Sequence, residues 1–312
     1  MRHHVYFSPG MFGFGKLGSY TYFAHVEREL TARFAAAGHE LIAHVIEDLP
    51  TASIRRRSTR LAEVVQRTAT GADPIHLLGH STGGLDARLV ASPSTTSIPA
   101  GVLGWLPRLR TITTMNTPHY GTPLASFFAT SKGQRVLAVL SMLTVAGLTL
   151  GATPLRAMSV VLGFLQRGDL AIPFKLFMLD RAVESVVGMV DDAGSPEVRS
   201  FLAAIEEDQG SMLQLSPESM DLVVAGFEDR RGVRYQATAS MSPAPTPWRW
   251  VQTVGHPVRA LSLAIFYALH RITANIGERY PCHAHDGATA SIRAEYEAQV
   301  TEAFGRVPAV AD

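Results

Sequence analysis

The chain has 312 residues, of which 46% are hydrophobic and 18% charged, and its formal net charge is +1. This composition suits a globular protein with a sizeable core and excludes an intrinsically disordered chain. The balanced charge provides no field that would attract nucleic acid, so no nucleic-acid partner is expected. The single cysteine, Cys282, excludes an internal disulfide and a cysteine-based metal site.

Short apolar runs alternate with amphipathic segments as far as Met115. This alternation predicts βαβ units, and therefore an α/β fold with a parallel sheet and helices on both faces. No charged and then apolar leader precedes the first run, which predicts a cytoplasmic protein. The predicted strands cover Val5–Phe7, Leu41–Ile46 (expected to be buried), 74–78 and Arg110–Met115, and the predicted helices cover 23–34, 54–65 and a segment from Leu85.

The second predicted helix carries a cluster of basic residues beside its apolar stripe. We interpret the cluster as a solvent-exposed face of the helix rather than as an anion site. Its members are Arg55, Arg56, Arg57 and Arg60.

The third predicted strand runs directly into Gly79-His80-Ser81-Thr82-Gly83, and a helix is expected to follow. A Gly-x-Ser-x-Gly sequence between a strand and a helix is typical of a nucleophile elbow, a strained turn that exposes a reactive serine. Small residues are needed two positions before and after the serine because the strand and the helix come close together there. The loops 10–19, 80–83 and 116–123 all follow strands, so they are expected to meet at the carboxyl edge of the sheet, where ligands bind.

A long run without formal charge extends from Val136 to Leu155, and only Arg156 interrupts it before Gln166. Its length admits a membrane span, but Gly147 and Pro154 break it, which favours an apolar helical cap inserted after the fourth strand. We therefore predict a hydrolase-like core at 1–130, a helical cap or lid at 131–230, and a return to the core at 231–312. That last part is expected to contain a fifth strand at 233–239, a loop at 242–250 and two further helices.

Three motifs resemble those of bacterial α/β-hydrolase lipases and esterases of the triacylglycerol-lipase type, and they occur in the same order. Ser8–Phe14 resembles the oxyanion loop, with Pro9 where the family usually has histidine. Gly79–Leu85 is similar to the elbow, and Thr117–Pro123 is similar to the Thr-Pro-His-x-Gly-Thr segment. Together these motifs cover about the first 125 residues.

The resemblance implies that Ser81 is the nucleophile of an ester hydrolase that works through an acyl-enzyme. It also implies that the backbone N–H groups of Met11 and Thr82 stabilise the oxyanion. His119 belongs to a motif in which the family's histidine is structural. The implied substrate is a lipidic or otherwise apolar ester, and peripheral contact with a lipid interface would follow from the apolar cap. No metal or organic cofactor is required.

The catalytic acid and base are harder to assign. In this fold the expected order is serine, then acid, then histidine, but no histidine follows Asp286 in the segment His285-Asp286-Gly287. One explanation is that the chain ends before the family's acid and histidine, and so also lacks the last strand. A second is a rearranged triad, in which His283 or His285 is the base and an earlier carboxylate such as Asp229 orients it. His285 and Asp286 are the candidates for the base and the acid in the segment itself. A third is a hydrolase-like protein without catalysis.

Two other functions are compatible with the sequence. The same serine and fold serve acyltransferases and polyester depolymerases, which differ in the acceptor or in the substrate. From a different class, a binding or membrane-associated module would use the apolar segment and not the serine.

Overall fold

The computed structural model describes residues 1–11, 16–17, 20–47, 51–130, 133, 210–240 and 246–274. Five of the described strands form one parallel sheet in the order β4-β1-β5-β6-β7. This confirms the predicted α/β fold and its parallel sheet. The strands are β1 (Arg2–Ser8), β4 (Glu40–Val45), β5 (Ile75–His80), β6 (Leu109–Met115) and β7 (Arg234–Thr238). A short antiparallel hairpin of β2 (Lys16–Leu17) and β3 (Tyr20–Thr21) was not predicted.

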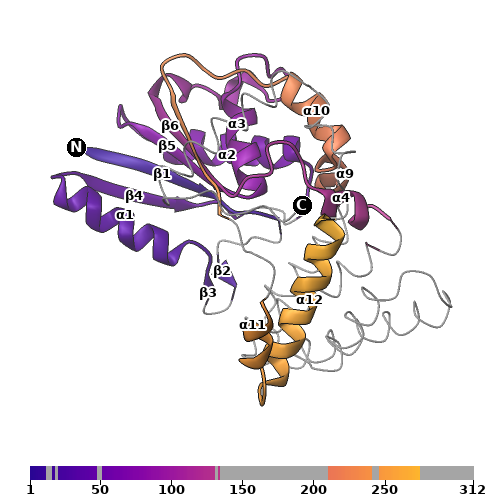
Figure 1. The fold of residues 1–312 in the computed structure, drawn as a ribbon. Coiled ribbons are helices and arrows are strands. Elements are labelled where there is room, and N and C mark those ends of the chain that lie inside the picture. Colours follow the sequence, from indigo (N-terminus) through magenta and orange to yellow (C-terminus); the bar gives the residue numbers. More distant parts are fainter. Residues whose placement is uncertain are drawn as a thin grey trace, which may run out of the picture.

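Helices cover both faces of the sheet, as the alternation of apolar runs predicts (Figure 1). On one face α1 (Ala24–Ala36) packs through Val26 and Leu30 on residues such as Phe7. On the other face α2 (Ile54–Thr68) and α3 (Thr82–Ala91) enclose a larger cluster that includes Leu61, Leu77 and Val90. These two cores hold β5 and α3 rigidly, and the junction between these two elements is the predicted elbow.

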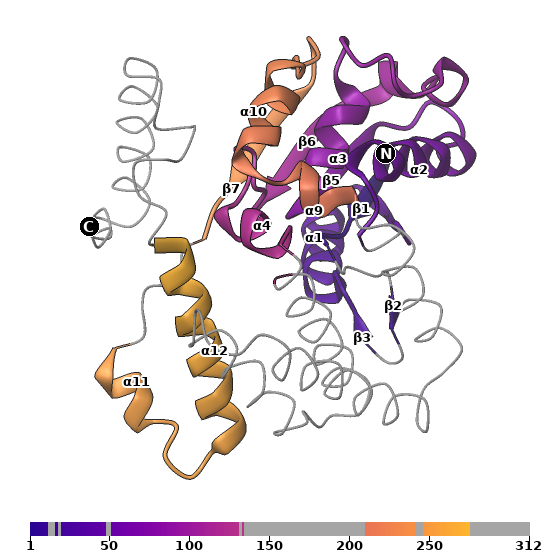
Figure 2. The same ribbon diagram turned by 90° about the vertical axis from the view of Figure 1, so that its right-hand side faces the viewer.

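The remaining described elements lie mainly beside the α2–α3 face and the carboxyl edge of the sheet. Leu215, in the turn between α9 and α10, and Met220 of α10 form a cluster with Ile54, Leu85 and Ala125, so this part of segment 131–230 packs on the core. Figure 2 shows α12 extending away from α4. The elements are the 3-10 turns η1 (Ala100–Val102) and η2 (Leu106–Arg108), and the helices α4 (Pro123–Phe128), α9 (Gly210–Gln214), α10 (Pro217–Ala225), α11 (Pro247–Val251) and α12 (Pro257–Ala274).

Two local predictions were wrong. Leu41–Ile46 was expected to be a buried strand, but β4 lies at an edge of the described sheet and most of its residues are only half-buried. The stretch 242–250 was expected to be a loop, but Pro247 begins the helix α11. Proline is well tolerated in the first turn of a helix, because the N–H that it lacks has no intrahelical partner there.

The apolar run Val136–Gln166 lies outside the described residues, and so does most of the predicted cap. None of the helices that the structure describes is long and apolar enough to cross a membrane.

A histidine pair links the starts of two neighbouring strands, at the end of the sheet away from the elbow. His3 Nδ1 lies 3.0 Å from His76 Nε2, and His76 Nδ1 lies 2.9 Å from the hydroxyl of Thr111. Burial lowers the pKa of His76 to about 4, and the positive charges of His3 and Arg110 act in the same direction. The ring of His76 is therefore neutral at pH 7.

We expect this pair to make the protein acid-sensitive. Between pH 6.5 and about 4 an unfolded chain protonates His76 while the folded chain does not, so stability falls as the pH is lowered through this window. His76→Gln keeps hydrogen-bonding groups and cannot titrate, so its urea midpoint should decline less steeply from pH 7 to pH 4.5. His256→Gln, at an exposed position, is the matched control and should keep the wild-type decline. An unchanged decline in His76→Gln would contradict the assignment.

Candidate active site

Ser81 occupies a strained turn between β5 and α3. Its backbone has φ 54° and ψ −125°, a conformation that residues with a side chain rarely adopt. The Ser81 N–H donates to the carbonyl oxygen of Met115 at 2.8 Å, which ties the turn to the end of β6. A serine held in such a conformation at a strand-to-helix junction is the geometry of a nucleophile elbow.

The glycines on both sides of Ser81 are required by close backbone contacts. A Cβ atom on Gly79 would lie 2.2 Å from the carbonyl oxygen of Gly83. A Cβ atom on Gly83 would lie 2.1 Å from the carbonyl oxygen of Ser8. Both obstacles are backbone atoms, which cannot move aside as a flexible side chain can. The Gly-x-Ser-x-Gly spacing is therefore a steric requirement of this turn.

The segment after β1 lies directly against Ser81. The parallel register pairs Ser8 with Gly79, so the residues that follow each of them continue side by side. A Cβ atom on Gly10 would lie only 2.8 Å from Cβ of Ser81. Met11 comes next, and it packs on the cluster around Leu85 and Ile54. The structure thus brings the Ser8–Met11 segment, which we call the oxyanion loop, to the candidate nucleophile.

Thr82 is the first residue of α3 and is fully buried. The first N–H groups of a helix have no intrahelical acceptor, and the helix dipole favours negative charge beside them. The start of α3 and the oxyanion loop therefore flank Ser81 from two sides. Backbone N–H groups in these two positions can stabilise an anionic oxygen that develops at the serine.

A second contact joins this region to the hairpin that follows the oxyanion loop. The hydroxyl of Tyr22, the residue after β3, lies 2.7 Å from Nδ1 of His80. Burial lowers the pKa of His80, so its ring is neutral at pH 7. Nothing in the spacing of these two residues predicts their contact, because the hairpin brings Tyr22 back to the elbow.

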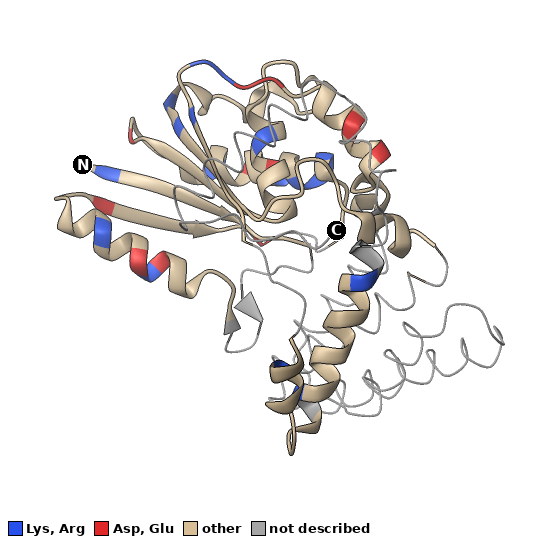
Figure 3. Ribbon diagram, viewed as in Figure 1, with Lys and Arg blue, Asp and Glu red and all other residues tan. Residues whose placement is uncertain are grey.

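One arginine of α2 was assigned wrongly from the sequence. Basic residues gather along this helix (Figure 3), and Arg55, Arg56 and Arg60 are exposed as expected. Arg57 instead is 1% exposed and forms an ion pair of 2.8 Å with Asp86, which is fully buried. A signal for this burial exists in the sequence, since Arg57 falls between Ile54 and Leu61 at helical spacing on the apolar stripe.

His119 is held by partners at the end of β6 and on α3. Its Nε2 lies 3.1 Å from the hydroxyl of Thr114, and its Nδ1 lies 3.5 Å from Arg88, which also donates to Asp229 at 3.0 Å. Burial, with the charge of Arg88, lowers the pKa of His119 to about 4. Arg88 can only donate, so Nδ1 of His119 is an acceptor and Nε2 carries the proton. Both ring nitrogens thus have partners other than Ser81.

Asp229 is more than half exposed. A helix rises 1.5 Å per residue, so Arg88, the partner of Asp229, lies about 10 Å beyond Ser81 along the axis of α3. His283, His285 and Asp286 lie outside the described residues. Within the described part of the chain no histidine forms a hydrogen bond with the Ser81 hydroxyl, and no group of three or more acidic, histidine or cysteine side chains is placed to hold a metal ion.

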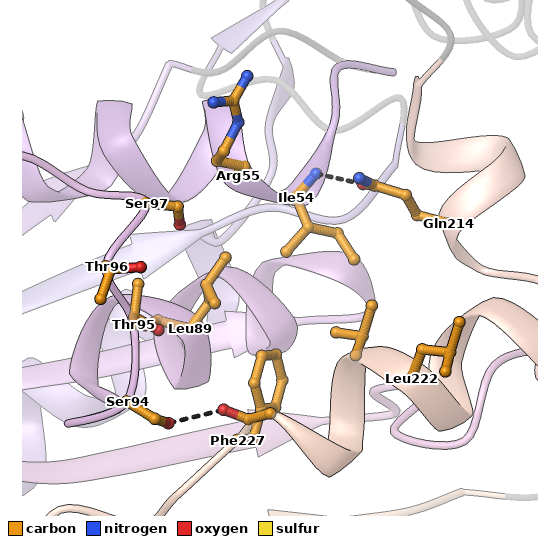
Figure 4. A pocket seen from close by; sticks show the side chains of 12 residues that line it. Ile54, Arg55, Leu89, Ser94, Thr95, Thr96, Ser97, Gln214, Leu222 and Phe227 are labelled. Carbon is orange, nitrogen blue, oxygen red and sulfur yellow. Dashed lines mark hydrogen bonds between the residues drawn. The ribbon is translucent and has the colours of Figure 1, made fainter.

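A pocket of about 330 Å³ lies between α2, α3 and α10, and Figure 4 shows its lining. Its wall is apolar on the α10 side and carries hydroxyl groups on the side of the loop after α3. Neither Ser81 nor the oxyanion loop lines it, so this pocket is distinct from the candidate active site. The lining residues are Ile54, Arg55, Leu89, Ser94, Thr95, Thr96, Ser97, Gln214, Leu222, Val223, Gly226 and Phe227.

No protein-family model matches the sequence, and no curated protein matches it. Among solved structures, the chain is similar to a Staphylococcus hyicus lipase, at 16% identity and a TM-score of 0.40, over 74% of this chain and 65% of that one. It is also similar to EstA from Clostridium botulinum (16% identity, TM-score 0.43, 75% of this chain and 59% of that one). The chain is similar as well to the mature Bacillus licheniformis lipase BlEst2, at 13% identity and a TM-score of 0.40, over 85% of this chain and 74% of that one. The chain thus spans less than two thirds of the length of the first two proteins.

Proposed function

We propose that this protein is a serine ester hydrolase that acts on apolar acyl esters through an acyl-enzyme. The observation that carries the proposal is the strained conformation of Ser81 at the junction of β5 and α3, with Gly10 in contact with it. A strained serine turn is unfavourable for stability, and such strain is retained where a function uses it. The adjoining N–H groups of Met11 and Thr82 supply the stabilisation that acyl transfer needs.

The reaction begins with attack of the Ser81 hydroxyl oxygen on the ester carbonyl. The hydroxyl proton passes to a general base, and the tetrahedral oxyanion accepts hydrogen bonds from the N–H groups of Met11 and Thr82. Collapse breaks the ester C–O bond, and the base returns its proton to the departing oxygen, so that the alcohol leaves and the acyl group stays on Ser81. Water then attacks the acyl-enzyme and releases the free acid. We assign the base to His285 and the orienting carboxylate to Asp286, as the sequence suggests. His119 is not assigned to the reaction, because both of its ring nitrogens have other partners.

A lipidic or apolar ester is the substrate class that the run Val136–Gln166 favours, because this segment, in which Arg156 is the one formal charge, offers an apolar surface for an acyl chain. Contact with a lipid interface and a cytoplasmic location are part of the same proposal. An acyltransferase or a polyester depolymerase would use the same serine. Product analysis with an added alcohol acceptor separates these reactions, since a transferase yields the new ester and a hydrolase yields the free acid.

Labelling with a fluorophosphonate probe tests the assignment. The probe is expected to form one adduct on Ser81 in the folded protein, identified by mass spectrometry of the peptide, and Ser81→Ala is expected to remain unlabelled. Ser92→Ala, at a buried serine outside the elbow, is the control and should label like the wild type. A folded wild-type protein without an adduct would refute the proposed function, and an adduct that survives Ser81→Ala would refute the residue.

A further inference from the structure

The carboxylate of Asp86 accepts hydrogen bonds from two residues, Arg57 and Ser8, in the interior of the protein. It lies on α3, little more than one turn after Ser81, and is fully buried. Its Oδ2 accepts from Arg57 Nε at 2.9 Å, from Arg57 Nη2 at 2.8 Å and from the hydroxyl of Ser8 at 3.1 Å. Ser8 is the last residue of β1, so this carboxylate connects the helix that starts at the nucleophile with the strand that precedes the oxyanion loop.

Arg57 extends this connection into the loop itself. Its Nη2 donates to the carbonyl oxygen of Pro9 at 2.6 Å, while the same guanidinium holds Asp86. With 1% of its surface exposed, Arg57 is screened from water, so these charge-assisted bonds are strong. The Pro9 carbonyl is thereby fixed one residue before Gly10, which contacts Ser81.

From these contacts we infer that Arg57 and Asp86 are a positioning pair for the oxyanion hole, an inference that rests on the proposed ester hydrolysis. The contacts that carry this inference join the pair to Ser8 and to Pro9 rather than to Ser81. The pair acts by holding the Pro9 carbonyl. This fixes the orientation of the peptide groups that follow, and with it the direction in which the Met11 N–H points. An oxyanion hole works only if its donors are aligned before the charge develops, because reorienting them during the reaction would raise the barrier.

The chemistry of arginine explains why this position carries it. A planar guanidinium has donors on fixed vectors, so it binds the Asp86 carboxylate and the Pro9 carbonyl together. A lysine ammonium at the same position is a point charge on a flexible stem and cannot reproduce both directions. We therefore expect Arg57→Lys to retain the positive charge but to lose much of the alignment of the Pro9 carbonyl and the Met11 N–H.

A structural role can be separated from a positioning role by two variants. Arg57→Met leaves the Asp86 carboxylate buried without its cation and should be destabilised. The double variant Arg57→Met/Asp86→Leu removes both charges and fills the space with apolar side chains, an exchange that is often neutral or stabilising. If the pair serves stability alone, the double variant should recover activity together with stability. If it positions the loop, stability should return and activity should not.

The experiment compares wild type, both variants, Arg57→Lys and Arg60→Met, an exposed control on the same helix. Melting temperature, the rate of fluorophosphonate labelling at Ser81, and kcat and KM for p-nitrophenyl butyrate are measured for each. We expect the double variant to melt near the wild type with kcat about 100-fold lower, the order of effect of losing one oxyanion donor, and with KM changed less than threefold. Labelling should slow in parallel, and Arg60→Met should match the wild type in every respect.

The outcomes distinguish the two proposals. If wild-type Ser81 is labelled and the stable double variant is labelled and turns over at the wild-type rate, the positioning inference is overturned and ester hydrolysis stands. If folded wild type is not labelled at Ser81, the proposed function fails and the inference fails with it. Slow labelling of a stable double variant beside normal labelling of Arg60→Met supports the inference.

Discussion

Ser81→Ala is expected to lower kcat for ester hydrolysis by about 10⁵–10⁶-fold, the order of loss when a catalytic serine is removed. Without the hydroxyl no acyl-enzyme forms, and the N–H groups of Met11 and Thr82 have no covalent intermediate to stabilise. The fold should be retained, because alanine fits wherever serine does and keeps the Cβ atom. Steady-state kinetics with a chromogenic ester, together with circular dichroism of both proteins, measure this effect.

The same position gives an independent test of strain. With φ 54° and ψ −125° at Ser81, both serine and alanine are strained, whereas glycine adopts positive φ readily. We therefore expect Ser81→Gly to be more stable than Ser81→Ala by about 1 kcal/mol in urea unfolding, while both are inactive. Equal or lower stability of the glycine variant would show that the turn stores no strain. A more stable glycine variant would show that the backbone conformation at Ser81 lowers the stability of the wild-type protein.

Gly83→Ala is expected to cause a large loss of stability, although it adds only a single methyl group. The added Cβ would lie 2.1 Å from the carbonyl oxygen of Ser8 and 2.7 Å from that of Pro9. Relieving the overlap requires α3 to move away from the end of β1, which would also disturb the buried contacts of Asp86. We expect a loss of more than about 3 kcal/mol, at or above the upper end of ordinary overpacking, and a fall in soluble yield.

Gly101→Ala is the matched control for this substitution. Nothing lies within 4 Å of a Cβ atom at Gly101, and its backbone does not have positive φ. The same methyl group should therefore change the urea midpoint by less than about 0.5 kcal/mol, as is usual for surface substitutions. If Gly83→Ala were as stable as Gly101→Ala, the close approach of α3 to β1 would be disproved.

Most of the described core elements were predictable because their signals are local. The segments Val5–Phe7 and Arg110–Met115 are strands in the structure, and the spacing of Val26 and Leu30 marks the helix α1. Burial of β4 was overestimated, because an apolar run shows that a strand is half-covered or better but not whether it lies at an edge. The hairpin β2–β3 was missed, since two-residue strands have no detectable periodicity.

In the candidate site, too, the sequence predicted the features whose signals are local and missed the contacts between distant residues. The elbow at Ser81 was predictable, since its glycines and its flanking strand and helix are contiguous in the sequence. The burial of Arg57 has a local signal in its place on the apolar stripe, although a run of arginines usually indicates a solvated face. Its partner has no local signal, because Asp86 lies 29 residues away. A buried pair of this kind exists only when two helices and a strand end converge.

The sequence alone determined the α/β class, the parallel order of strands and helices, and the turn that carries Ser81, because these depend on periodicity and on short-range sterics. The tertiary structure decided which groups meet around that turn. The Ser8–Gly79 register carries Gly10 to Ser81, and packing of α2 on α3 buries Arg57 against Asp86 and the Pro9 carbonyl. Contacts between residues distant in the chain follow from how whole elements pack, and a local pattern does not contain that information.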